Sequence, residues 1–362
     1  MQKVIINSPS LDPTKNVSGI SAVVQFIMNQ NHDVEYLHFE IGRKDDETGG
    51  FGRFLSIFQS LKQWKKTLKS HPNAIVHFNF ALTKLSIIRD SVYLHFVRKN
   101  KLVVHLHGGN YLFEDNMPFY ISWLLKRLFR KDVPFIVLSD KEKDRIEEKY
   151  HAKTVVSLPN CVDLSEAKSF ERKTPGECLT LGYIGRIAET KGMKELLEAC
   201  VTMKNDKVPF KLIIAGSERN GDAFLSQFRT LLGDSFEYAG VVSGEAKNRF
   251  LKEMDVFVLP SYFEGLPISL LEAMSFGAVP VTTNVGSIGT VIRDNKNGMF
   301  IRVKNSDDIV EKVKHLISDA ELFDQLSRNA RNTIFSDFNP QDYFVKLHNI
   351  YIYPYKALCH KK

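Results

Sequence analysis

Cysteine, tryptophan and long apolar runs are scarce in this sequence of 362 residues. The four cysteines are scattered and form no CxxC pair, which argues against a zinc module and a disulfide framework and fits a reducing cytoplasm. No apolar run approaches the roughly 20 residues that span a bilayer. The N-terminus also lacks the basic and apolar regions of a secretory signal. We therefore expect a cytoplasmic protein.

Negative charge is in deficit, and the deficit is uneven. The net charge is +7, and residues 1–170 hold 24 Lys and Arg against 18 Asp and Glu. A basic surface suits nucleic acid, anionic lipid or a phosphorylated substrate, and composition does not choose among them. Because the sequence has no helix-turn-helix signature, aromatic stacking motif or zinc module, we expect no nucleic-acid partner.

Short β-branched runs alternate with helical periodicity, which predicts parallel sheets covered on both faces. In the first half, the predicted strands are 4–7, 34–39, 74–80, 102–107, 134–138 and 154–158. In the second half they are 179–184, 210–215, 236–239, 256–259 and 279–282. The sequence therefore predicts an α/β protein with two doubly wound domains, whose ligand lies at the carboxyl ends of the strands in a cleft between them.

Charge, proline and glycine interrupt this alternation once, near the middle of the chain. We predict an N-terminal domain over 1–168 and a linker over 169–178. A C-terminal domain is predicted over 179–335. The helical segment 336–362 is expected to return toward the N-terminal domain.

The most informative stretch is 260–274, where an apolar strand leads through a Pro/Ser/Gly loop into a helix. Pro267 suits the first helical position, and the free N–H groups of the first turn favour an anion such as a phosphate. Glu264 precedes the helix, and Glu272 lies eight residues later. Two carboxylates at different positions along the helix could each accept hydrogen bonds from the hydroxyls of a different sugar. Spacing alone is equally compatible with a helix cap and a solvated surface charge.

A second cluster follows the strand 179–184. The strand leads into Gly185 and Arg186, and Lys191 and Gly192 lie on the loop before the next helix. An arginine fork and a lysine converging there could neutralise a diphosphate. Two ordinary surface cations are an equally good interpretation of this cluster taken alone.

Taken together, these segments resemble the retaining glycosyltransferases of family 4, of the type that builds bacterial surface polysaccharides. The matching positions are Gly185-Arg186, Lys191-Gly192, Pro260-Ser261, Glu264-Gly265 and Glu272. Looser similarity lies in Asn160-Cys161-Val162-Asp163, in Val17-Ser18-Gly19-Ile20 and in His105-Leu106-His107-Gly108. The resemblance implies the GT-B fold of two facing Rossmann-like domains, with 1–168 as the acceptor-side domain and 179–335 as the nucleotide-sugar-binding domain. It covers essentially the whole chain, most strongly over 179–300.

The resemblance implies roles for particular residues. Arg186 and Lys191 would hold the donor diphosphate, Glu264 would bind donor-sugar hydroxyls, and His107 would contact the sugar or the acceptor. A histidine packed at a strand end is an equally good interpretation of His107. The other implied donor-binding residues are Ser18, Gly19, Gly185, Gly265, Leu266, Pro267, Ile268 and Glu272.

The implied reaction moves a sugar from a nucleotide-diphosphate sugar to a glycan or lipid-linked acceptor with retention of configuration. No D-x-D motif is present, so the metal-binding carboxylate pair of the other large transferase fold is absent. We expect no metal and no cofactor, with Arg186 and Lys191 serving in place of a cation. One position departs from the family: its G-G-x-x-E pattern ends here in Thr290 instead of glutamate.

The sequence is also compatible with other functions. A nucleotide-sugar epimerase or a phosphorylase would share the fold, and a non-catalytic nucleotide-sugar-binding protein would share the site. Two basic amphipathic stretches, 53–69 and 120–131, fit either packing on a sheet or peripheral contact with anionic lipid on the inner face of the membrane.

Overall fold

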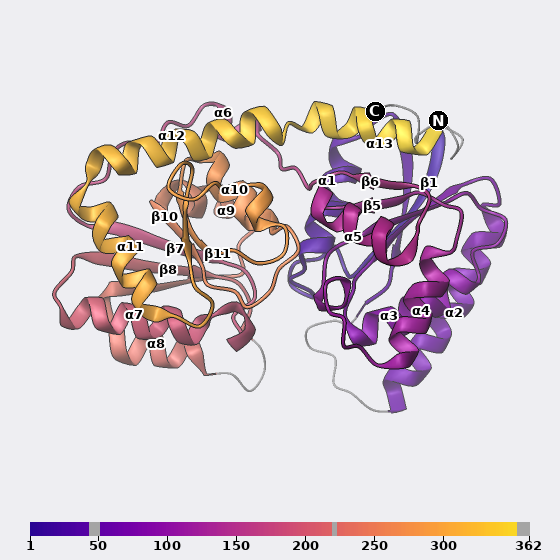
Figure 1. Cartoon of the computed structure of the whole chain (residues 1–362), viewed down its shortest axis with the longest axis horizontal. Coiled ribbons are helices and arrows are strands. Elements are labelled where there is room, and N and C mark those ends of the chain that lie inside the picture. Colours follow the sequence, from indigo (N-terminus) through magenta and orange to yellow (C-terminus); the bar gives the residue numbers. More distant parts are fainter. Residues whose placement is uncertain (43–50, 219–222, 353–362) are drawn as a thin grey trace. The chain divides into compact units, whose positions relative to one another are not determined.

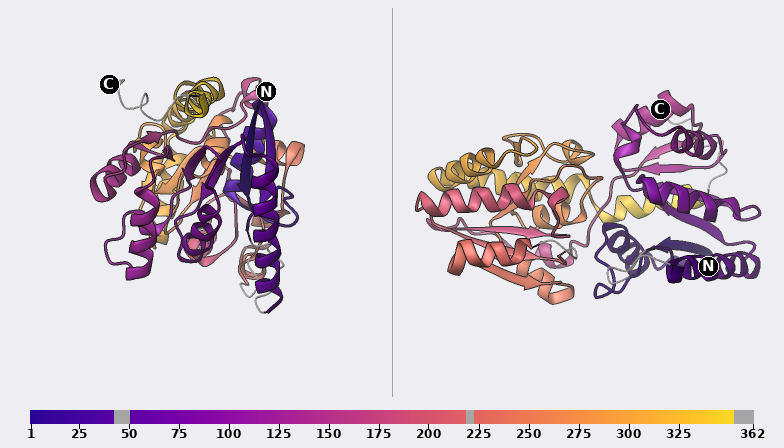
Figure 2. Two further views of the ribbon diagram at one scale, coloured as in Figure 1. Left: turned by 90° about the vertical axis from the view of Figure 1, so that its right-hand side faces the viewer. Right: turned by 90° about the horizontal axis from the view of Figure 1, so that it is seen from below.

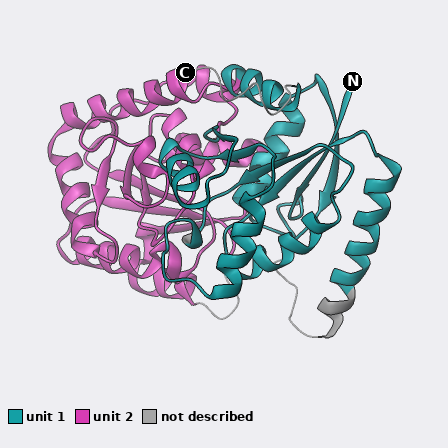
Figure 3. Cartoon of the chain, turned by 45° about the vertical axis from the view of Figure 1, so that its right-hand side comes forward, with its two compact units in different colours: residues 1–160, 341–362 teal, residues 161–340 magenta. Residues whose placement is uncertain are grey.

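The computed structural model describes residues 1–42, 51–218 and 223–352, with the side chains of 51–55 and of residue 110 left out. The chain divides into two compact units (Figures 1 and 3). The first comprises Met1–Asn160 together with the segment after Pro340, and the second comprises Cys161–Pro340. The segment predicted as a linker, 169–178, lies within the second unit, so the chain changes unit near 160 and again near 340.

The first unit is built on a six-stranded parallel sheet in the order β2-β1-β3-β4-β5-β6. Its strands are β1 (Gln2–Ser8), β2 (Val34–Glu40), β3 (Ile75–Phe80), β4 (Leu102–Leu106), β5 (Phe135–Val137) and β6 (Val155–Ser157). The chain reverses its direction of winding between β1 and β3. That reversal is the switch point at which doubly wound sheets bind ligands.

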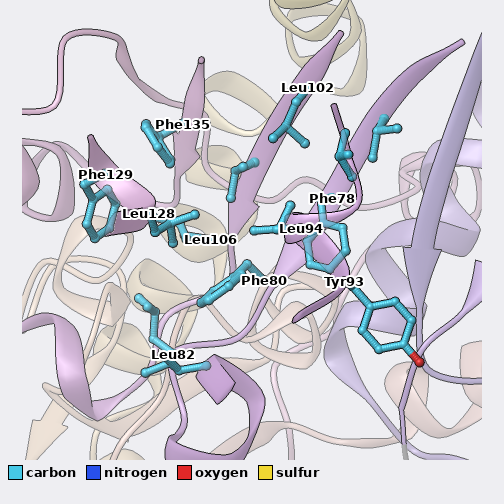
Figure 4. Close-up of a cluster of buried hydrophobic side chains, with 14 of the residues drawn as sticks. Phe78, Phe80, Leu82, Tyr93, Leu94, Leu102, Leu106, Leu128, Phe129 and Phe135 are labelled. Carbon is cyan, nitrogen blue, oxygen red and sulfur yellow. The ribbon is translucent and has the colours of Figure 1, made fainter. Parts of the chain in front are cut away.

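Helices cover both faces of this sheet (Figures 1 and 2). They are α1 (Gly19–Gln30), α2 (Phe51–Ser70), α3 (Lys84–His95), α4 (Phe119–Phe129), α5 (Asp140–Tyr150) and α13 (Pro340–Ile352), with a 3-10 turn η1 (Asn110–Leu112). One face carries α2 to α5, which contribute side chains to a single apolar cluster with β3, β4 and β5 (Figure 4). On the other side α1 and α13 meet, where Phe26 stacks on Phe344 with ring centroids 5.5 Å apart.

The second unit contains another six-stranded parallel sheet, ordered β12-β11-β10-β7-β8-β9. Its strands are β7 (Leu179–Ile184), β8 (Phe210–Ala215), β9 (Phe236–Gly240), β10 (Val256–Leu259), β11 (Val279–Thr283) and β12 (Met299–Ile301). Its helices are α6 (Ser165–Lys168), α7 (Met193–Asn205), α8 (Phe224–Leu232), α9 (Gly244–Glu253), α10 (Ile268–Ser275), α11 (Ser306–Ser318) and α12 (Ala320–Asp337). Three 3-10 turns complete it: η2 (Glu189–Lys191), η3 (Gly233–Ser235) and η4 (Ile288–Thr290).

The predicted fold class, with two doubly wound Rossmann-like domains, is confirmed. All eleven predicted strands are present, and β12 is an additional strand of three residues that the sequence analysis missed. The apolar residues of 120–131 pack on the sheet, since Ile121, Leu125, Leu128 and Phe129 are buried. Within the residues that the structure describes, no helix combines the length and apolarity needed to cross a bilayer.

Candidate functional site

The switch point of the second sheet lies between β7 and β10. These strands pair in parallel, with Val256 opposite Leu181 and Phe257 opposite Gly182, although they are more than 70 residues apart in the chain. Their carboxyl ends therefore leave the sheet side by side, carrying the 185–192 loop and the 260–267 loop. This is where an open α/β sheet forms a ligand crevice.

The two loops are in direct backbone contact. Gly192 has a φ of +73°, and a Cβ placed on it would lie 2.2 Å from the carbonyl oxygen of Pro260. Two residues along each loop, the amide of Tyr262 donates to the carbonyl of Thr190 at 3.0 Å. Only glycine permits both this left-handed conformation and this approach. The contact fixes the two loops relative to each other.

Lys191 and Glu264 meet across this junction. The Nζ of Lys191 lies 2.6 Å from Oε1 of Glu264, and the hydroxyl of Ser261 donates to the same oxygen at 2.7 Å. The Glu264 side chain is 10% exposed, that of Lys191 is 27% exposed, and Ser261 is fully buried. Among the described residues, none bonds the second oxygen of Glu264. That oxygen is an acceptor available to a ligand hydroxyl.

Arg186 lies on the first of the two loops and is exposed. A hydrogen bond holds its backbone in place, because the phenol of the buried Tyr183 donates to the Arg186 carbonyl at 2.6 Å. Burial raises the pKa of Tyr183 well above its usual range, so this donor stays protonated. The exposed Arg186 side chain therefore starts from a backbone that a hydrogen bond fixes.

The helix α10 continues the second loop. It begins at Ile268, so Pro267 occupies the cap position with an extended ψ of 126°, one residue earlier than predicted. The helix has no acidic residue in its first turn. Its first N–H groups have no partners within the helix, as at every helix start, and with the helix dipole they favour an anion. Gly265 and Leu266 lie immediately before this end.

Glu272 lies on α10 and has a partner that the sequence analysis missed. The Nζ of Lys247 on α9 lies 2.6 Å from its Oε1, and the side chains are 30% and 16% exposed. Nothing in the sequence distinguishes Lys247 from an ordinary helix lysine, since the pairing arises only in the folded unit. As in Glu264, one carboxylate oxygen is held by a lysine.

The loop after β11 makes backbone contacts with the loop that carries Glu264. The amide of Ser287 donates to the Gly265 carbonyl at 3.0 Å, and a Cβ on Gly286 would lie 2.0 Å from the Glu264 carbonyl oxygen. Thr290, where the sequence resemblance implies a glutamate, is exposed in η4. Its hydroxyl donates to the Ser287 carbonyl at 2.6 Å, within its own turn.

In the first unit, Ser18 and Gly19 lie where the chain returns from β1 into α1. Ser18 caps the helix by position, but its side chain makes no capping hydrogen bond. Gly19 is exposed, and a Cβ there would meet nothing within 4 Å. The helix start is therefore open, with no acidic residue in its first turn.

His107 follows β4 and is held by an asparagine pair that the sequence analysis also missed. Its Nε2 lies 2.5 Å from Oδ1 of Asn79. The Asn79 amide donates to the carbonyl of Asn7 at 2.7 Å, and the Asn7 amide donates back at 3.1 Å. Burial, with a smaller contribution from His77, lowers the pKa of His107 to about 3. Because Asn79 Oδ1 can only accept, the neutral ring carries its proton on Nε2 and presents Nδ1 as an acceptor.

A line of buried hydrogen bonds lies beside this pair. Asn31 donates to the hydroxyl of Tyr36 at 2.8 Å, and Tyr36 bonds to Tyr351 of α13. The Tyr351 hydroxyl lies 2.5 Å from Nδ1 of His77, whose Nε2 lies 3.1 Å from Nδ1 of His105. The donor and acceptor roles at His77 and His105 depend on the tautomers of the two rings. The line ends at Nε2 of His105, which is buried with no hydrogen-bond partner in the described part of the chain.

The predicted site residues are divided between the two units, and the structure brings them together only in the second. In the second, Lys191 and Glu264 are in contact, with Gly185, Arg186 and the start of α10 on the same two loops. In the first, Ser18 and Gly19 follow β1, whereas His107 follows β4, with β3 lying between those strands. The roles assigned to these residues stay predictions.

Comparison with known proteins finds a family match within the second unit. Residues 165–333 match the family "Glycosyl transferases group 1". The chain is 24% identical over 278 residues to the putative colanic acid biosynthesis glycosyltransferase WcaL of Salmonella typhimurium, covering 74% of this chain and 67% of that protein. The chain spans only part of such curated relatives, from 26% to 67% of their own length.

Two solved structures share the fold across nearly the whole chain. Sucrose-phosphate synthase from Thermosynechococcus elongatus has a TM-score of 0.77 at 15% identity, covering 97% of this chain and 98% of that one. Anabaena HepE in complex with UDP-glucose has a TM-score of 0.72 at 15% identity, covering 96% and 100%. The predicted resemblance to glycosyltransferases of the GT-B fold is confirmed, and its assignment to family 4 stays a prediction.

Proposed function

We propose that this chain, in which residues 165–333 form a glycosyl transferases group 1 domain, transfers a sugar from a nucleotide-diphosphate sugar to a glycan or lipid-linked acceptor. The observation that carries the proposal is the contact of Lys191 with Glu264 at the switch point of that domain. A cation and a carboxylate there match the two parts of the donor, a diphosphate and a sugar.

The diphosphate is assigned to the cationic side of this site. Lys191 and Arg186 supply positive charge, and the first turn of α10 supplies N–H groups. As the bond from the anomeric carbon to the phosphate oxygen breaks, its electron pair moves onto the diphosphate. Fixed donors that stabilise such developing charge contribute roughly 10²–10³ in rate each. With these groups in place, we propose that the reaction needs no metal.

The two glutamates are assigned to the two sugars of the donor. Glu264 would accept a hydrogen bond from the transferred sugar through the oxygen that Lys191 and Ser261 leave available. Glu272 would accept from the ribose, held in place by Lys247. Gly265 and Leu266 would present backbone N–H groups near the phosphates.

Retention of configuration is part of the proposal. The acceptor hydroxyl would attack the anomeric carbon from the face that the phosphate leaves. The new bond joins the acceptor oxygen to that carbon, and the acceptor proton passes to the departing diphosphate. No covalent enzyme intermediate and no side-chain base are then required.

The names of similar proteins support the biological setting. WcaL is named for colanic acid biosynthesis, and HepE was solved with UDP-glucose. We propose a role in building a bacterial surface polysaccharide in the cytoplasm, with a uridine nucleotide as the first donor base to test.

The first test is a thermal-shift screen with UDP, GDP, ADP and their sugar conjugates in the presence of a chelator. A ligand at 100 times its Kd stabilises the folded protein by about 2.7 kcal/mol. We expect one nucleotide series to raise the Tm of the wild type and of Glu245→Ala, an exposed glutamate on α9 that serves as a matched control. Glu272→Ala should lose most of the shift.

Transfer itself is then measured with the stabilising donor and a panel of glycan and lipid-linked acceptors. Product with the anomeric configuration of the donor supports the proposal. No shift with any nucleotide would refute nucleotide-sugar binding. Binding with no transfer across the panel would favour a non-catalytic nucleotide-sugar-binding protein.

A further inference from the structure

The outer surface of α2, α3 and α4 is unusual in its charge. These three helices contain nine Lys and Arg and a single acidic residue, Asp90. Asp90 is fully buried and accepts from Nε of Arg89 at 2.7 Å, so it adds no negative charge to the surface. The charged residues on the outer surface of the three helices are therefore all cations.

The neighbouring helix shows that this is not a property of the whole sheet face. α5 packs into the same apolar cluster, and its sequence DKEKDRIEEKY mixes acidic with basic residues. Asp140, Asp144 and Glu148 of α5 are exposed. The carboxylate-free surface thus ends at α5.

Large apolar side chains lie on the same three helices, in addition to those that pack on the sheet. On α4, Phe119 is 83% exposed and Trp123 is 54% exposed, spaced four residues apart. On α3, Leu85 is 72% exposed, with Ile88 and Val92 following at helical spacing on the same side. Both rows point away from the sheet, because the opposite sides of these helices supply buried residues to the apolar cluster.

The two rows are neighbours. Lys84 of α3 lies over the ring of Tyr120 of α4, 5.9 Å from its centroid, so the helices are side by side at their starts (Figure 1). Arg127 lies over the Trp123 ring at 5.5 Å, which places a cation directly beside an exposed aromatic ring. On α2, the half-exposed Phe58 lies under Nζ of Lys62 at 4.7 Å.

A hollow of about 360 Å³ adds to the cationic character of α2. Four lysines and a serine line it: Lys62, Lys65, Lys66, Lys69 and Ser70. No carboxylate lines the hollow, so phosphate groups would find only positive charge there.

We propose that the outer surface of α2, α3 and α4, here called the cationic-aromatic face, binds the surface of an anionic phospholipid bilayer. Aromatic side chains prefer the headgroup boundary, and a helix that lies in this plane carries apolar residues flanked by Lys and Arg. A second protein copy would have to bring a strongly acidic surface to this face, whereas an anionic bilayer supplies one everywhere. The inference adds a partner to the proposed enzyme and suits a lipid-linked acceptor, yet it depends only on residues of the first unit.

The first experiment is co-sedimentation of the full chain with vesicles of phosphatidylethanolamine containing about one third phosphatidylglycerol, against neutral phosphatidylcholine vesicles. We expect binding to the anionic vesicles alone. Each basic residue near such a surface contributes roughly a fivefold factor in partitioning. Removing four lysines of α2 as Gln should weaken binding by more than about a hundredfold. The matched control removes four exposed or half-exposed lysines of the second unit: Lys207, Lys296, Lys312 and Lys314.

Salt and apolar variants separate the two contributions. Raising salt from about 50 to about 500 mM should reduce binding strongly, because the Debye length falls to a few ångströms. Phe119→Ser combined with Trp123→Ser should reduce it by roughly tenfold or more. Both side chains are at least half exposed, so neither change leaves a cavity in the core.

Trp123 also reports insertion directly. The chain has two tryptophans, and the other, Trp64, is fully buried and donates to the carbonyl of Tyr93 at 3.1 Å. A blue shift in emission on adding anionic vesicles, with quenching by brominated lipid, should therefore come from Trp123. Trp123→Phe should abolish the optical signal while keeping co-sedimentation.

Three outcomes would overturn the inference: equal binding to neutral and anionic vesicles, wild-type affinity in the α2 lysine variant, or a Trp123 emission that vesicles leave unchanged. A dimer that forms without lipid and is lost in the Phe119 and Trp123 variant would assign the face to a second copy instead. Failure of the nucleotide screen with intact vesicle binding would refute the proposed transferase and leave this inference standing.

Discussion

Gly192→Ala tests whether the junction of the two loops builds the site. The φ of +73° at Gly192 is left-handed, which costs an alanine about 1–2 kcal/mol. In addition, the new Cβ would lie 2.2 Å from the Pro260 carbonyl oxygen, a backbone atom that cannot move without shifting the loop. We expect a total loss of about 4 kcal/mol or more, at the upper end of single substitutions.

The chain offers a close control. Gly240 has the same φ of +73°, and a Cβ there meets nothing within 4 Å. Gly240→Ala therefore carries the conformational cost without the collision, and should lose about 1–2 kcal/mol. The difference between the two variants measures the loop contact alone.

Two measurements follow the pair. Urea unfolding of both variants, monitored by circular dichroism, gives the difference in stability. Nucleotide titration at low temperature, where both variants are folded, gives the effect on the site. We expect affinity to fall at least tenfold in Gly192→Ala and to stay near wild type in Gly240→Ala. Equal stability and equal affinity in the two variants would refute the structural role of the junction.

Three further predictions concern single side chains. Lys191→Ala and Glu264→Gln should each lower kcat by roughly 10²–10³, measured by donor consumption with a fixed acceptor, and wild-type turnover in either would contradict the assigned roles. Lys247→Ala should weaken nucleotide binding about tenfold through Glu272, whereas Lys247→Arg should retain it, as calorimetry would show. Burial lowers the pKa of His77 to about 3 in the folded protein, against 6.5 when unfolded, so stability should fall as pH drops below 6.5, by up to about 1.4 kcal/mol per pH unit for this residue. Urea unfolding at pH 7 and pH 5 checks this. His77→Phe should reduce the dependence by the share of His77 only, because burial also lowers the pKa of His105 and of His107.

Local pattern predicted most of the fold, because buried parallel strands are near-continuous apolar runs. β12 was missed because its three residues stand between the polar stretch 293–298 and Arg302, although Met299 and Ile301 are buried. β5 and β6 are equally short, but apolar residues continue to Leu138 and Leu158. Pro267 was misplaced by one residue, since a proline is compatible with either the cap or the first turn.

The candidate site was predictable only as a set of residues. The loops carrying Lys191 and Glu264 were identified, but their contact depends on β10 returning beside β7, which no local spacing contains. Lys247 and Asn79 were missed for the same reason: each matters through a residue distant in the chain. A buried asparagine within an apolar strand run was the one available signal for Asn79.

The buried line of hydrogen bonds that ends at His105 has a consequence for synthesis. Tyr351 belongs to α13, and Leu347 and Ile350 of the same helix are also buried. The first unit is therefore incomplete until the ribosome has passed residue 351, about 190 residues after the unit's main segment ends at Asn160. At 5–20 residues per second this is a delay of roughly 10–40 s. During that interval His77 lacks its hydrogen bond to Tyr351. The first unit, whose synthesis begins first, therefore completes its fold after the second unit has been synthesised.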